Sequence, residues 1–592
     1  MMTRMLLFLC LMLIAGMVMA QVAAATWHAA KAPLMTRWAK AVSPRNALPE
    51  YPRPQMVRKD WLNLNGLWEL SILADERGTV ASNHQILVPY PVESALSGVM
   101  ERAERLRYHR TFEIPQAWAG QRVILHFGAV DWQAKVSING AMVMEHEGGY
   151  DGFSVDITDH LTASKQDLVV EVFDPSDGGN QPRGKQVNKP GGIFYTPCTG
   201  IWQTVWLEPV PQSSIRQLII TPDVENSCLR LRVRVDGSEG VVVRAVARDG
   251  NRNVGAAEGA PGEEMKVPVP NAKLWSPSSP FLYGLNVSTR RNGKPADSVR
   301  SYFGMRSIDI RKVNGIPRMM LNGKPVFQVG PLDQGFWPDG IYTAPTDAAL
   351  KYDIAIAKKL GFNMIRKHVK VEPERWYYWC DKMGMLVWQD MPSGDNKSEE
   401  SRRQFERELQ RMVRGRHNNP CIIMWVPFNE GWGQYDTERI APWVKSLDPS
   451  RLVNNASGWT DAGVGDTFDT HSYPAPKSPA PVWPRVAVVG EFGGLGLPVR
   501  NHTWTKKAWG YQTLKDRNAL TAEYVDLFRQ VWALKDDPGI CAVVYTQTTD
   551  VETECNGILT YDRAIIKMDS AAVRAANTGQ IPPPQVKNEA AP

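Results

Sequence analysis

From about residue 307 onward, the sequence alternates short apolar runs with longer amphipathic segments, and this alternation constrains the fold more than any other feature. The apolar runs are rich in β-branched and aromatic residues and are bounded by turn residues, which is typical of buried strands. Eight runs can be assigned, at 326–330, 363–366, 386–390, 422–426, near 453, and at 468–473, 486–490 and 541–545. Strands that alternate with helices pair in parallel, so a series of this length predicts a (β/α)₈ barrel.

The segments between these runs have helical signals of unequal strength. Thr346 is a plausible N-cap for the first helix, and apolar residues follow it at helical spacing. The segments 458–466 and 474–484 are instead rich in Gly and Pro, so we expect the helices there to be short or missing. The expected inward faces of two helices consist of Leu350, Ile354 and Ala357, and of Phe405, Leu409 and Met412.

Two of the predicted strands end in a carboxylate. Ile422–Val426 leads into Asn429-Glu430, and Val486–Gly490 leads directly into Glu491. A carboxylate is costly to bury without a partner, so each glutamate needs a reason to be there. Because active sites of such barrels lie at the carboxyl ends of the strands, we expect Glu430 and Glu491 to work as a pair on one substrate.

The region before the barrel reads as two all-β domains. Short β-rich runs separated by turn signals, including Asn139-Gly140, predict a β-sandwich over residues 50–212. Leu229–Val235 alternates apolar and polar residues, which predicts an immunoglobulin-like sandwich over residues 213–306. The expected architecture is therefore multidomain β and α/β, with the barrel over residues 307–576 and a tail at 577–592.

The first residues have the pattern of a targeting signal. Arg4 precedes an apolar run from Met5 to Met19, and small residues follow up to Ala25, which is the layout of a cleavable signal peptide at 1–25. The run is too short for a comfortable membrane span. We therefore expect a periplasmic or secreted protein without a membrane segment in its mature form, which begins with a linker at 26–49.

Composition narrows the classes of partner. The 68 basic and 62 acidic residues give a net charge of +6 without a long basic run, which disfavours nucleic acid. The six cysteines after the first residues show no paired metal-ligand spacing, and both buried thiols and disulfides stay open. The 21 tryptophans and 17 tyrosines suit stacking on sugars, although aromatic residues also fill cores.

An ordered set of short motifs resembles glycoside hydrolase family 2 over residues 50 to 575. That family joins a sugar-binding jelly roll, an immunoglobulin-like sandwich and a catalytic TIM barrel. Each motif alone is weak, but their order is specific. The motifs are Tyr51-Pro52-Arg53-Pro54, Asn65-Gly66-Leu67-Trp68, Glu145-His146-Glu147-Gly148-Gly149-Tyr150, Leu274-Trp275-Ser276-Pro277, Phe303-Gly304-Met305-Arg306, Leu321-Asn322-Gly323-Lys324-Pro325, Gly361-Phe362-Asn363, Asn429-Glu430 and Gly490-Glu491-Phe492-Gly493.

The resemblance implies retaining hydrolysis, with Glu430 as general acid/base and Glu491 as nucleophile. In the covalent route one carboxyl group protonates the leaving oxygen while the other attacks the anomeric carbon, at a separation of ~5–5.5 Å. The resemblance also implies that Asn429 hydrogen-bonds the 2-hydroxyl of the sugar, that Arg366 keeps Glu491 charged and that Tyr473 donates to it.

Further residues at strand ends or in loops are candidates for reading the sugar. For each of them the alternative is a loop-capping carboxylate, a satisfied core histidine or ordinary packing. The candidates are Asp333, His368, Asp390, His471, Trp432, Gln547 and Asp151, the last in a jelly-roll loop that we expect to reach the barrel mouth.

The chain departs from the family pattern where the sugar is read. Arg366 is followed by Lys367-His368-Val369-Lys370 where family members often have Thr-Ser-His, and Tyr545-Thr546-Gln547 replaces an expected tryptophan. The Asn-x-Lys pair of family β-glucuronidases is not evident, although Lys367 and Lys370 could supply the charge. We expect no required metal and no cofactor.

The sequence thus predicts an exported exo-β-glycosidase that acts on an oligosaccharide or glycoside, most simply a β-galactosidase. β-Glucuronidase, β-mannosidase and furanosidase activities are alternatives within the family. A non-catalytic carbohydrate-binding protein is the alternative of another class, and the intact pair of glutamates argues against it. The sequence leaves the oligomeric state open.

Overall fold

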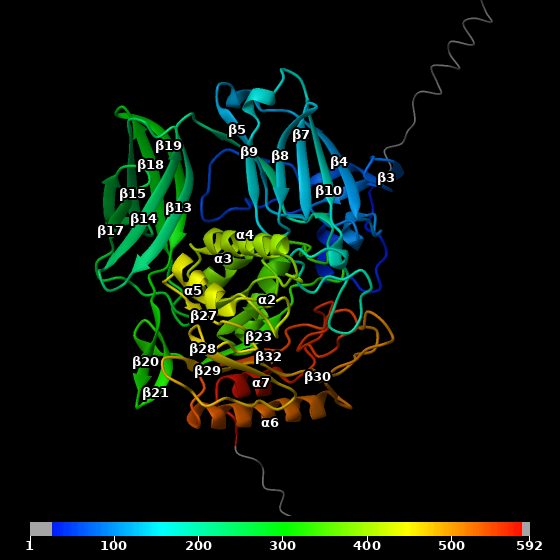
Figure 1. Cartoon of the computed structure of the whole chain (residues 1–592), viewed down its shortest axis with the longest axis vertical. Coiled ribbons are helices and arrows are strands. Elements are labelled where there is room, and N and C mark those ends of the chain that lie inside the picture. The colour runs from blue at the N-terminus through cyan, green and yellow to red at the C-terminus, as the bar shows by residue number, and fades with distance from the viewer. Residues whose placement is uncertain (1–26, 583–592) are drawn as a thin grey trace, which may run out of the picture.

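The computed structural model describes residues 27–582, which fold into two β-sandwiches and a barrel (Figure 1). The expected signal peptide at 1–25, on which the expected export rests, lies outside the described residues, as does the tail from residue 583 onward. Within 27–582, no helix is both long enough and apolar enough to span a bilayer.

The first domain is a sandwich of two antiparallel sheets. Alternating residues of its strands face a shared core that includes Trp68, Leu125 and Val136. The six-stranded sheet has the order β3-β2-β4-β10-β7-β8, formed by Val80–Val88, Gly66–Leu73, Arg105–Phe112, Gln166–Phe173, Gln133–Ile138 and Ala141–Glu147. The four-stranded sheet has the order β1-β12-β5-β9, formed by Leu62–Asn63, Val205–Val210, Arg122–Phe127 and Phe153–Asp156. A short pair, β6 (Val130–Asp131) and β11 (Gly200–Ile201), adjoins them.

The second domain is the predicted immunoglobulin-like sandwich. Its alternating strand β14 buries Leu229, Leu231 and Val233 and leaves the intervening arginines exposed, as the period-2 pattern predicts. One sheet has the order β13-β14-β17, formed by Ser214–Asp223, Cys228–Asp236 and Glu264–Pro268. The other has the order β16-β15-β18-β19, formed by Arg252–Gly259, Val241–Asp249, Tyr283–Arg291 and Lys294–Phe303.

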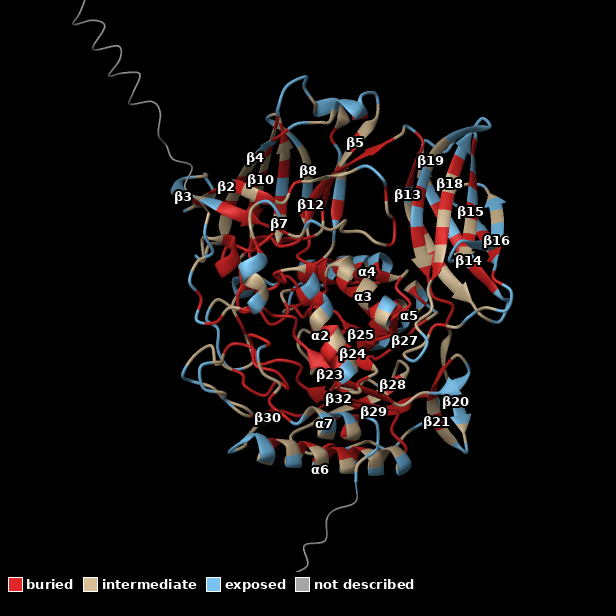
Figure 2. Ribbon diagram, turned by 180° about the vertical axis from the view of Figure 1, so that it is seen from behind, coloured by how far each residue is buried: buried red, intermediate tan, exposed pale blue. Residues whose placement is uncertain are grey.

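The third domain is the predicted parallel barrel, and its strands are among the most buried segments of the protein (Figure 2). The hydrogen-bonded order is β27-β26-β25-β24-β23-β32-β29-β28. Between β27 and β28, the backbone N–H of Asp466 donates to the carbonyl of Val453 at 2.7 Å, which nearly closes the ring. In chain order the strands are β23 (Gln328–Asp333), β24 (Met364–Lys367), β25 (Leu386–Asp390), β26 (Ile422–Val426), β27 (Leu452–Val453), β28 (Thr467–Ser472), β29 (Val486–Gly493) and β32 (Ala542–Thr546).

The helices around the barrel follow the predicted pattern. The side chain of Thr346 accepts a hydrogen bond from the N–H of Ala349 and caps the first helix, and the two predicted apolar faces are buried. No described helix separates β27 from β28 or β28 from β29, as the Gly and Pro content there predicts. The helices are α2 (Asp347–Lys359), α3 (Glu374–Met383), α4 (Glu399–Arg416), α5 (Thr437–Leu447), α6 (Arg517–Asp536) and α7 (Ser570–Asn577).

The first barrel strand starts two residues later than predicted, at Gln328. A small antiparallel sheet precedes it, formed by β20 (Ile308–Val313), β21 (Ile316–Leu321) and β22 (Lys324–Pro325). Because Lys324 and Pro325 pair with β21, the chain must turn before it can enter the barrel. Between β29 and α6, Leu495–Gly496 (β30) and Gln512–Thr513 (β31) form a further short pair.

The segment expected as a linker packs against the barrel. The backbone N–H and the hydroxyl of Thr36 donate to the carboxylate of Asp339 at 2.8 and 2.6 Å. The ring of Trp38, in the short 3₁₀ helix Arg37–Ala41, contacts the edges of Trp337 and Tyr352. Residues 27–49 are therefore packed against the barrel domain and are not a loose linker. The six cysteines between 27 and 582 are all free and buried.

Candidate active site

Glu430 lies just beyond β26, where the chain leaves the barrel wall. Pro427 has no N–H with which to continue the ladder, so β26 ends at Val426. Glu430 then adopts a left-handed conformation with φ of +52°, and its N–H donates to the carbonyl of Ser457 at 2.8 Å. A positive φ is costly for a residue such as glutamate, and it persists only where the surrounding structure enforces it. The carboxylate of Glu430 is partly exposed.

Glu491 lies within β29 rather than after it. The pairing of β28 with β29 shifts register after Thr470, so that His471 lies opposite Glu491. Gly490 is required at the preceding position, because a Cβ there would lie 2.3 Å from the carboxylate of Asp469. The strand therefore carries a buried glutamate whose neighbours are fixed by close packing.

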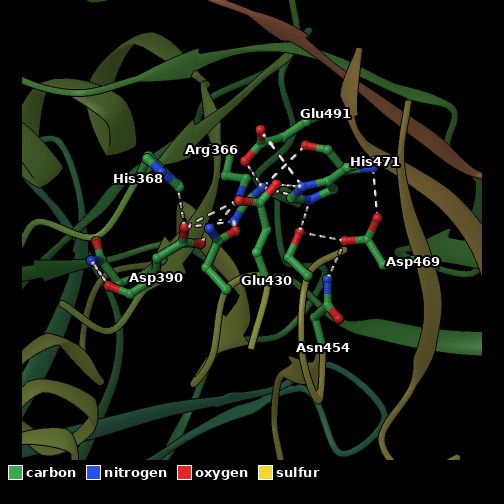
Figure 3. Close-up of polar contacts among 12 residues, drawn as sticks. Arg366, His368, Asp390, Glu430, Asn454, Asp469, His471 and Glu491 are labelled. Carbon is green, nitrogen blue, oxygen red and sulfur yellow. Dashed lines mark hydrogen bonds and ion pairs between the residues drawn. The ribbon is translucent and has the colours of Figure 1, made fainter. Parts of the chain in front are cut away.

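The two carboxylates meet at the mouth of the barrel with an imidazole beside them (Figure 3). One oxygen of Glu430, one oxygen of Glu491 and a ring nitrogen of His471 all lie within 4.8 Å of one another. The Nδ1 atom of His471 is 2.6 Å from Oε1 of Glu430 and 3.6 Å from Oε2 of Glu491. This separation suits a pair that attacks and protonates one bond.

Glu491 is held in its charged form. Arg366 donates to Oε1 at 3.1 Å, and the hydroxyl of Tyr473 donates to Oε2 at 2.5 Å. Burial by itself favours the neutral acid, but the charges of His471 and Arg366 outweigh it and lower the pKa of Glu491 to about 2. The two contacts expected for Glu491 from the sequence are both present.

Arg366, at the end of β24, is the hub of the site. It is fully buried, and its guanidinium also donates to both oxygens of Asp390, at 2.8 Å in its shortest contact, and to Oδ1 of Asn429 at 2.7 Å. A bidentate arginine fixes orientation as well as charge. The amide nitrogen of Asn429 has no hydrogen-bond partner within residues 27–582 and is buried. It is thus a donor that a ligand hydroxyl would satisfy.

His471 is oriented from behind by a chain of hydrogen bonds (Figure 3). Its Nε2 atom lies 2.8 Å from the hydroxyl of Ser457, which donates to Asp469 at 2.6 Å, and Asn454 donates to the same oxygen of Asp469. Burial opposes the charged imidazole, but the charge of Glu491 and the hydrogen bond to Glu430 raise the pKa of His471 above its ordinary value.

His368 borders the same space but has the opposite electrostatics. Its Nδ1 atom lies 3.0 Å from Oδ2 of Asp390. Burial and the nearby charges of Lys185 and Arg366 lower the pKa of His368 well below its ordinary value, which favours the neutral ring. Burial outweighs Arg366 at Asp390 and raises the pKa of that carboxyl group.

Asp333 does not face the glutamate pair, in contrast to the sequence expectation. Its carboxylate accepts from Nζ of Lys367 at 2.7 Å, and Lys367 also donates to Glu372 at 2.8 Å. Lys370 lies 3.0 Å from Glu372 and donates to two backbone carbonyls. The reason is the alternation of side chains along β24, because Arg366 points into the barrel and its neighbour points to the opposite side. Lys367 and Lys370 are therefore saturated by internal partners.

Asp151 also lies elsewhere than expected. It faces Arg411 of α4 at 3.5 Å and His146 at 3.4 Å. Its loop folds onto the outer helices and lines a cavity of about 500 Å³ between the jelly roll and the barrel. The expectation that Asp151 reaches the barrel mouth is wrong, since a loop's destination depends on the packing of the two domains.

Two further candidates lie near the mouth. Trp432 stacks on Phe194 of the jelly roll, with ring centroids 5.4 Å apart. Gln547, after β32, is buried and donates to Asn556 at 2.7 Å, while its carbonyl oxygen has no partner within the described chain. Trp432 and Gln547 are therefore both placed where they could contact a ligand in the barrel mouth.

Sequence reasoning missed the loop by which the jelly roll completes the mouth. Residues 174–199, between β10 and β11, descend to the barrel, where Thr196 and Tyr195 bind the carboxylates of Glu552 and Glu554 (Figure 1). Lys185 of this loop lies 4.8 Å from the ring centroid of Trp432. The basic and aromatic residues of this loop are a sequence signal for a binding segment. The packing of the two domains is needed to show that the loop reaches the barrel mouth.

The side chains of Glu430, His471 and Glu491 are also the one set within residues 27–582 close enough to bind a metal ion together. Two carboxylates and an imidazole are common ligands for divalent cations. The same atoms would serve acid/base and nucleophilic chemistry.

Fold and site together define a class, namely a three-domain protein with a carboxylate pair at the mouth of a (β/α)₈ barrel. Residues 62–197 match the sugar binding domain of glycosyl hydrolases family 2, residues 213–306 match a domain described simply as glycosyl hydrolases family 2, and residues 318–473 match the TIM barrel domain of that family. The chain belongs to glycosyl hydrolases family 2.

Relatives with named activities fall into two groups. The chain is 27% identical to a β-galactosidase of Thermoanaerobacter pseudethanolicus over 355 residues, which is 56% of this chain and 45% of the relative. It is 27% identical to a putative β-glucuronidase of Formosa agariphila over 381 residues, 58% and 43% of the two chains. It thus spans less than half the length of these two relatives.

A third relative is matched over more of its length. The chain is 25% identical to a β-glucuronidase of Paenibacillus borealis over 453 residues, 68% and 74% of the two chains. Among solved structures, the β-glucuronidase of Ruminococcus gnavus in complex with D-glucuronic acid superposes with a TM-score of 0.74 at 18% identity, covering 90% of this chain and all of that one. That likeness concerns the fold.

Proposed function

We propose that this protein is a retaining exo-β-glycosidase that removes terminal β-linked sugars, with β-D-glucuronides as its preferred substrates. The observation that carries the reaction class is the pair of carboxylates within 4.8 Å at the barrel mouth, one of them held charged. The named relatives favour glucuronides over the β-galactosides expected from sequence, since β-glucuronidases predominate among them.

In the first step the charged carboxylate of Glu491 attacks the anomeric carbon while the bond to the leaving oxygen breaks. Glu430 gives its proton to that oxygen, and the sugar becomes an ester of Glu491. The free amide donor of Asn429 binds the 2-hydroxyl, a contact that strengthens as positive charge develops on the ring. Arg366 and Tyr473 keep the nucleophile ionised and aligned.

In the second step Glu430 acts as the base. It takes a proton from water, the water oxygen attacks the anomeric carbon, and Glu491 leaves as a carboxylate. Two inversions give net retention. His471 contacts both carboxylates and holds their separation through the cycle.

The test is a panel of 4-nitrophenyl β-D-glycosides carrying glucuronic acid, galactose, glucose and mannose, assayed with the wild type and with Glu491→Ala. We expect the highest kcat/KM for the glucuronide, no turnover by the variant, and full activity after treatment with EDTA. Sugar binding without turnover of any glycoside by the wild type would instead identify a carbohydrate-binding protein. Loss of activity in EDTA that Mn²⁺ or Mg²⁺ restores would assign a metal to the site.

A further inference from the structure

Lys185 is a buried cation that forms no ion pair with another described residue. It lies in the jelly-roll loop 174–199 and is only 6% exposed, yet no carboxylate oxygen lies within 4.0 Å of its Nζ atom in the described chain. A buried, unpaired ammonium group costs several kcal/mol unless something compensates it. Its Nζ atom lies 4.8 Å from the ring centroid of Trp432 and 5.9 Å from that of Phe194.

Two other buried lysines, at the end of β24 and just beyond it, have carboxylate partners. Lys367 has two carboxylates within 2.8 Å, and Lys370 has one carboxylate at 3.0 Å and two backbone carbonyls. All three lysines are at least 94% buried, so burial does not distinguish them. Of the three, only Lys185 has no carboxylate or carbonyl oxygen bound to its ammonium group among the described residues.

The ammonium group of Lys185 lies near enough to the glutamate pair to interact with its charges. Burial lowers the pKa of Lys185, and the charges of Glu554, Glu491 and Glu430 oppose that effect. Those charges act through a site largely shielded from water, where interactions reach further. Trp432, over which the ammonium lies, follows Glu430 by two residues.

The backbone around Lys185 is fixed by both domains. The N–H of Gly184 donates to the carbonyl of Ser393 in the barrel at 3.0 Å, and a Cβ at Gly184 would lie 2.4 Å from the carbonyl of Val369. On the other side, Gln186 donates to Asp131 at 2.8 Å, and the carbonyl of Lys185 accepts from the N–H of Tyr195 at 2.9 Å. The lysine is therefore held in place before a ligand arrives, which lowers the entropic cost of binding.

We propose that Lys185 binds the carboxylate of a terminal uronic acid, so that the sugar-binding domain, and not the barrel, supplies the charge that selects the substrate. This inference rests on the proposed glycosidase function. A uronate would provide the missing counter-ion, whereas a neutral hexose would leave the ammonium unpaired. The discrimination follows from the penalty of burying an unpaired charge.

The test compares two substrates that differ only at C6, 4-nitrophenyl β-D-glucuronide and 4-nitrophenyl β-D-glucoside. In Lys185→Met the ratio of kcat/KM for the glucuronide to that for the glucoside should fall roughly 100-fold. The exposed Lys189→Met on the same loop is the matched control and should leave the ratio unchanged. An unchanged ratio in Lys185→Met would overturn the proposal, because it would mean that Lys185 only balances Glu554 and the catalytic charges.

Binding calorimetry separates this inference from the hydrolytic function. If the wild type hydrolyses neither glycoside, the proposed function fails, but D-glucuronate and D-glucose can still be titrated. Tighter binding of glucuronate by the wild type and by Lys185→Arg, lost in Lys185→Met and Lys185→Gln, supports the proposal. Equal affinities for the two sugars in the wild type contradict it. Thermal unfolding of each variant, matched to Lys189→Met, verifies that the fold is intact.

Discussion

The carboxyl ends of β26 and β29 carry the same side chain in different surroundings. Glu491 is buried within its strand and bound by Arg366 and Tyr473, and its pKa is lowered to about 2. Glu430 lies beyond its strand at a positive φ and is partly exposed, and its carboxylate has one hydrogen bond within the described chain, to His471. The comparison teaches that backbone position assigns the roles, since Glu491 is fixed as an anion by two donors, whereas Glu430 stays partly exposed with a single contact to its carboxylate.

Removing the fixed carboxylate should have the largest effect. Glu491→Ala should lower kcat by on the order of 10⁵-fold, because no ester can form. Added azide would enter the space left by the carboxylate and attack the substrate directly, giving the α-glycosyl azide. Product analysis by NMR checks this outcome. Formation of the β-azide would mean that the two roles are exchanged.

Removing the exposed carboxylate should have a smaller effect that depends on the leaving group. Glu430→Ala should lower kcat/KM by roughly 10²–10⁴-fold for an alkyl glycoside, which needs protonation, and far less for a 2,4-dinitrophenyl glycoside, which does not. Azide should here attack the glycosyl ester and give the β-glycosyl azide. Equal losses for both leaving groups would contradict the acid role.

Removing a hydrogen bond to Glu491 should reduce the difference between the surroundings of the two carboxylates. The hydroxyl of Tyr473 stabilises the charged form of Glu491, so Tyr473→Phe should raise the pKa of Glu491. The nucleophile would then lose its charge at a higher pH, and the acidic limb of kcat/KM should move to higher pH. The plateau should fall about 10- to 100-fold, as for a hydrogen bond to a charged group. A pH profile with an unmoved acidic limb would refute this assignment.

The smallest loss of activity is expected from removing the hydroxyl group that contacts His471. Ser457→Ala removes the hydroxyl that links His471 to Asp469 and should lower kcat about fivefold, the value of one hydrogen bond of ~1 kcal/mol. Ser446→Ala, an exposed hydroxyl on α5, is the control. Steady-state kinetics on the preferred substrate measure both, and a Ser457→Ala enzyme as active as the control would show that this chain of bonds does not position His471.

Sequence periodicity was sufficient for the architecture because strands and helices are set by local patterns. The three domains, the two missing barrel helices and the N-cap at Thr346 all follow from spacing and turn residues. Glu430, Glu491, Arg366 and Tyr473 could be placed together because each belongs to the carboxyl end of a barrel strand or the segment just beyond it, and those ends meet.

The remaining site residues depend on contacts that no local pattern encodes. Asp333 forms an ion pair with Lys367, and Asp151 forms one with Arg411. Both cations lie on segments distant in sequence. Lys185 could not be predicted from the sequence, because nothing in the local pattern distinguishes a buried lysine without an ion pair from an exposed one. Long-range pairing and domain packing decide these cases.

The central claim is that Glu491 forms a covalent bond to the sugar and Glu430 helps to release it. The most direct measurement is the anomeric configuration of the first-formed product, followed by ¹H NMR during rapid hydrolysis of a β-glycoside of the preferred sugar by the wild type. Two displacements predict that the β-anomer appears first and mutarotates afterwards. Initial release of the α-anomer would show a single displacement and would contradict the nucleophilic role of Glu491.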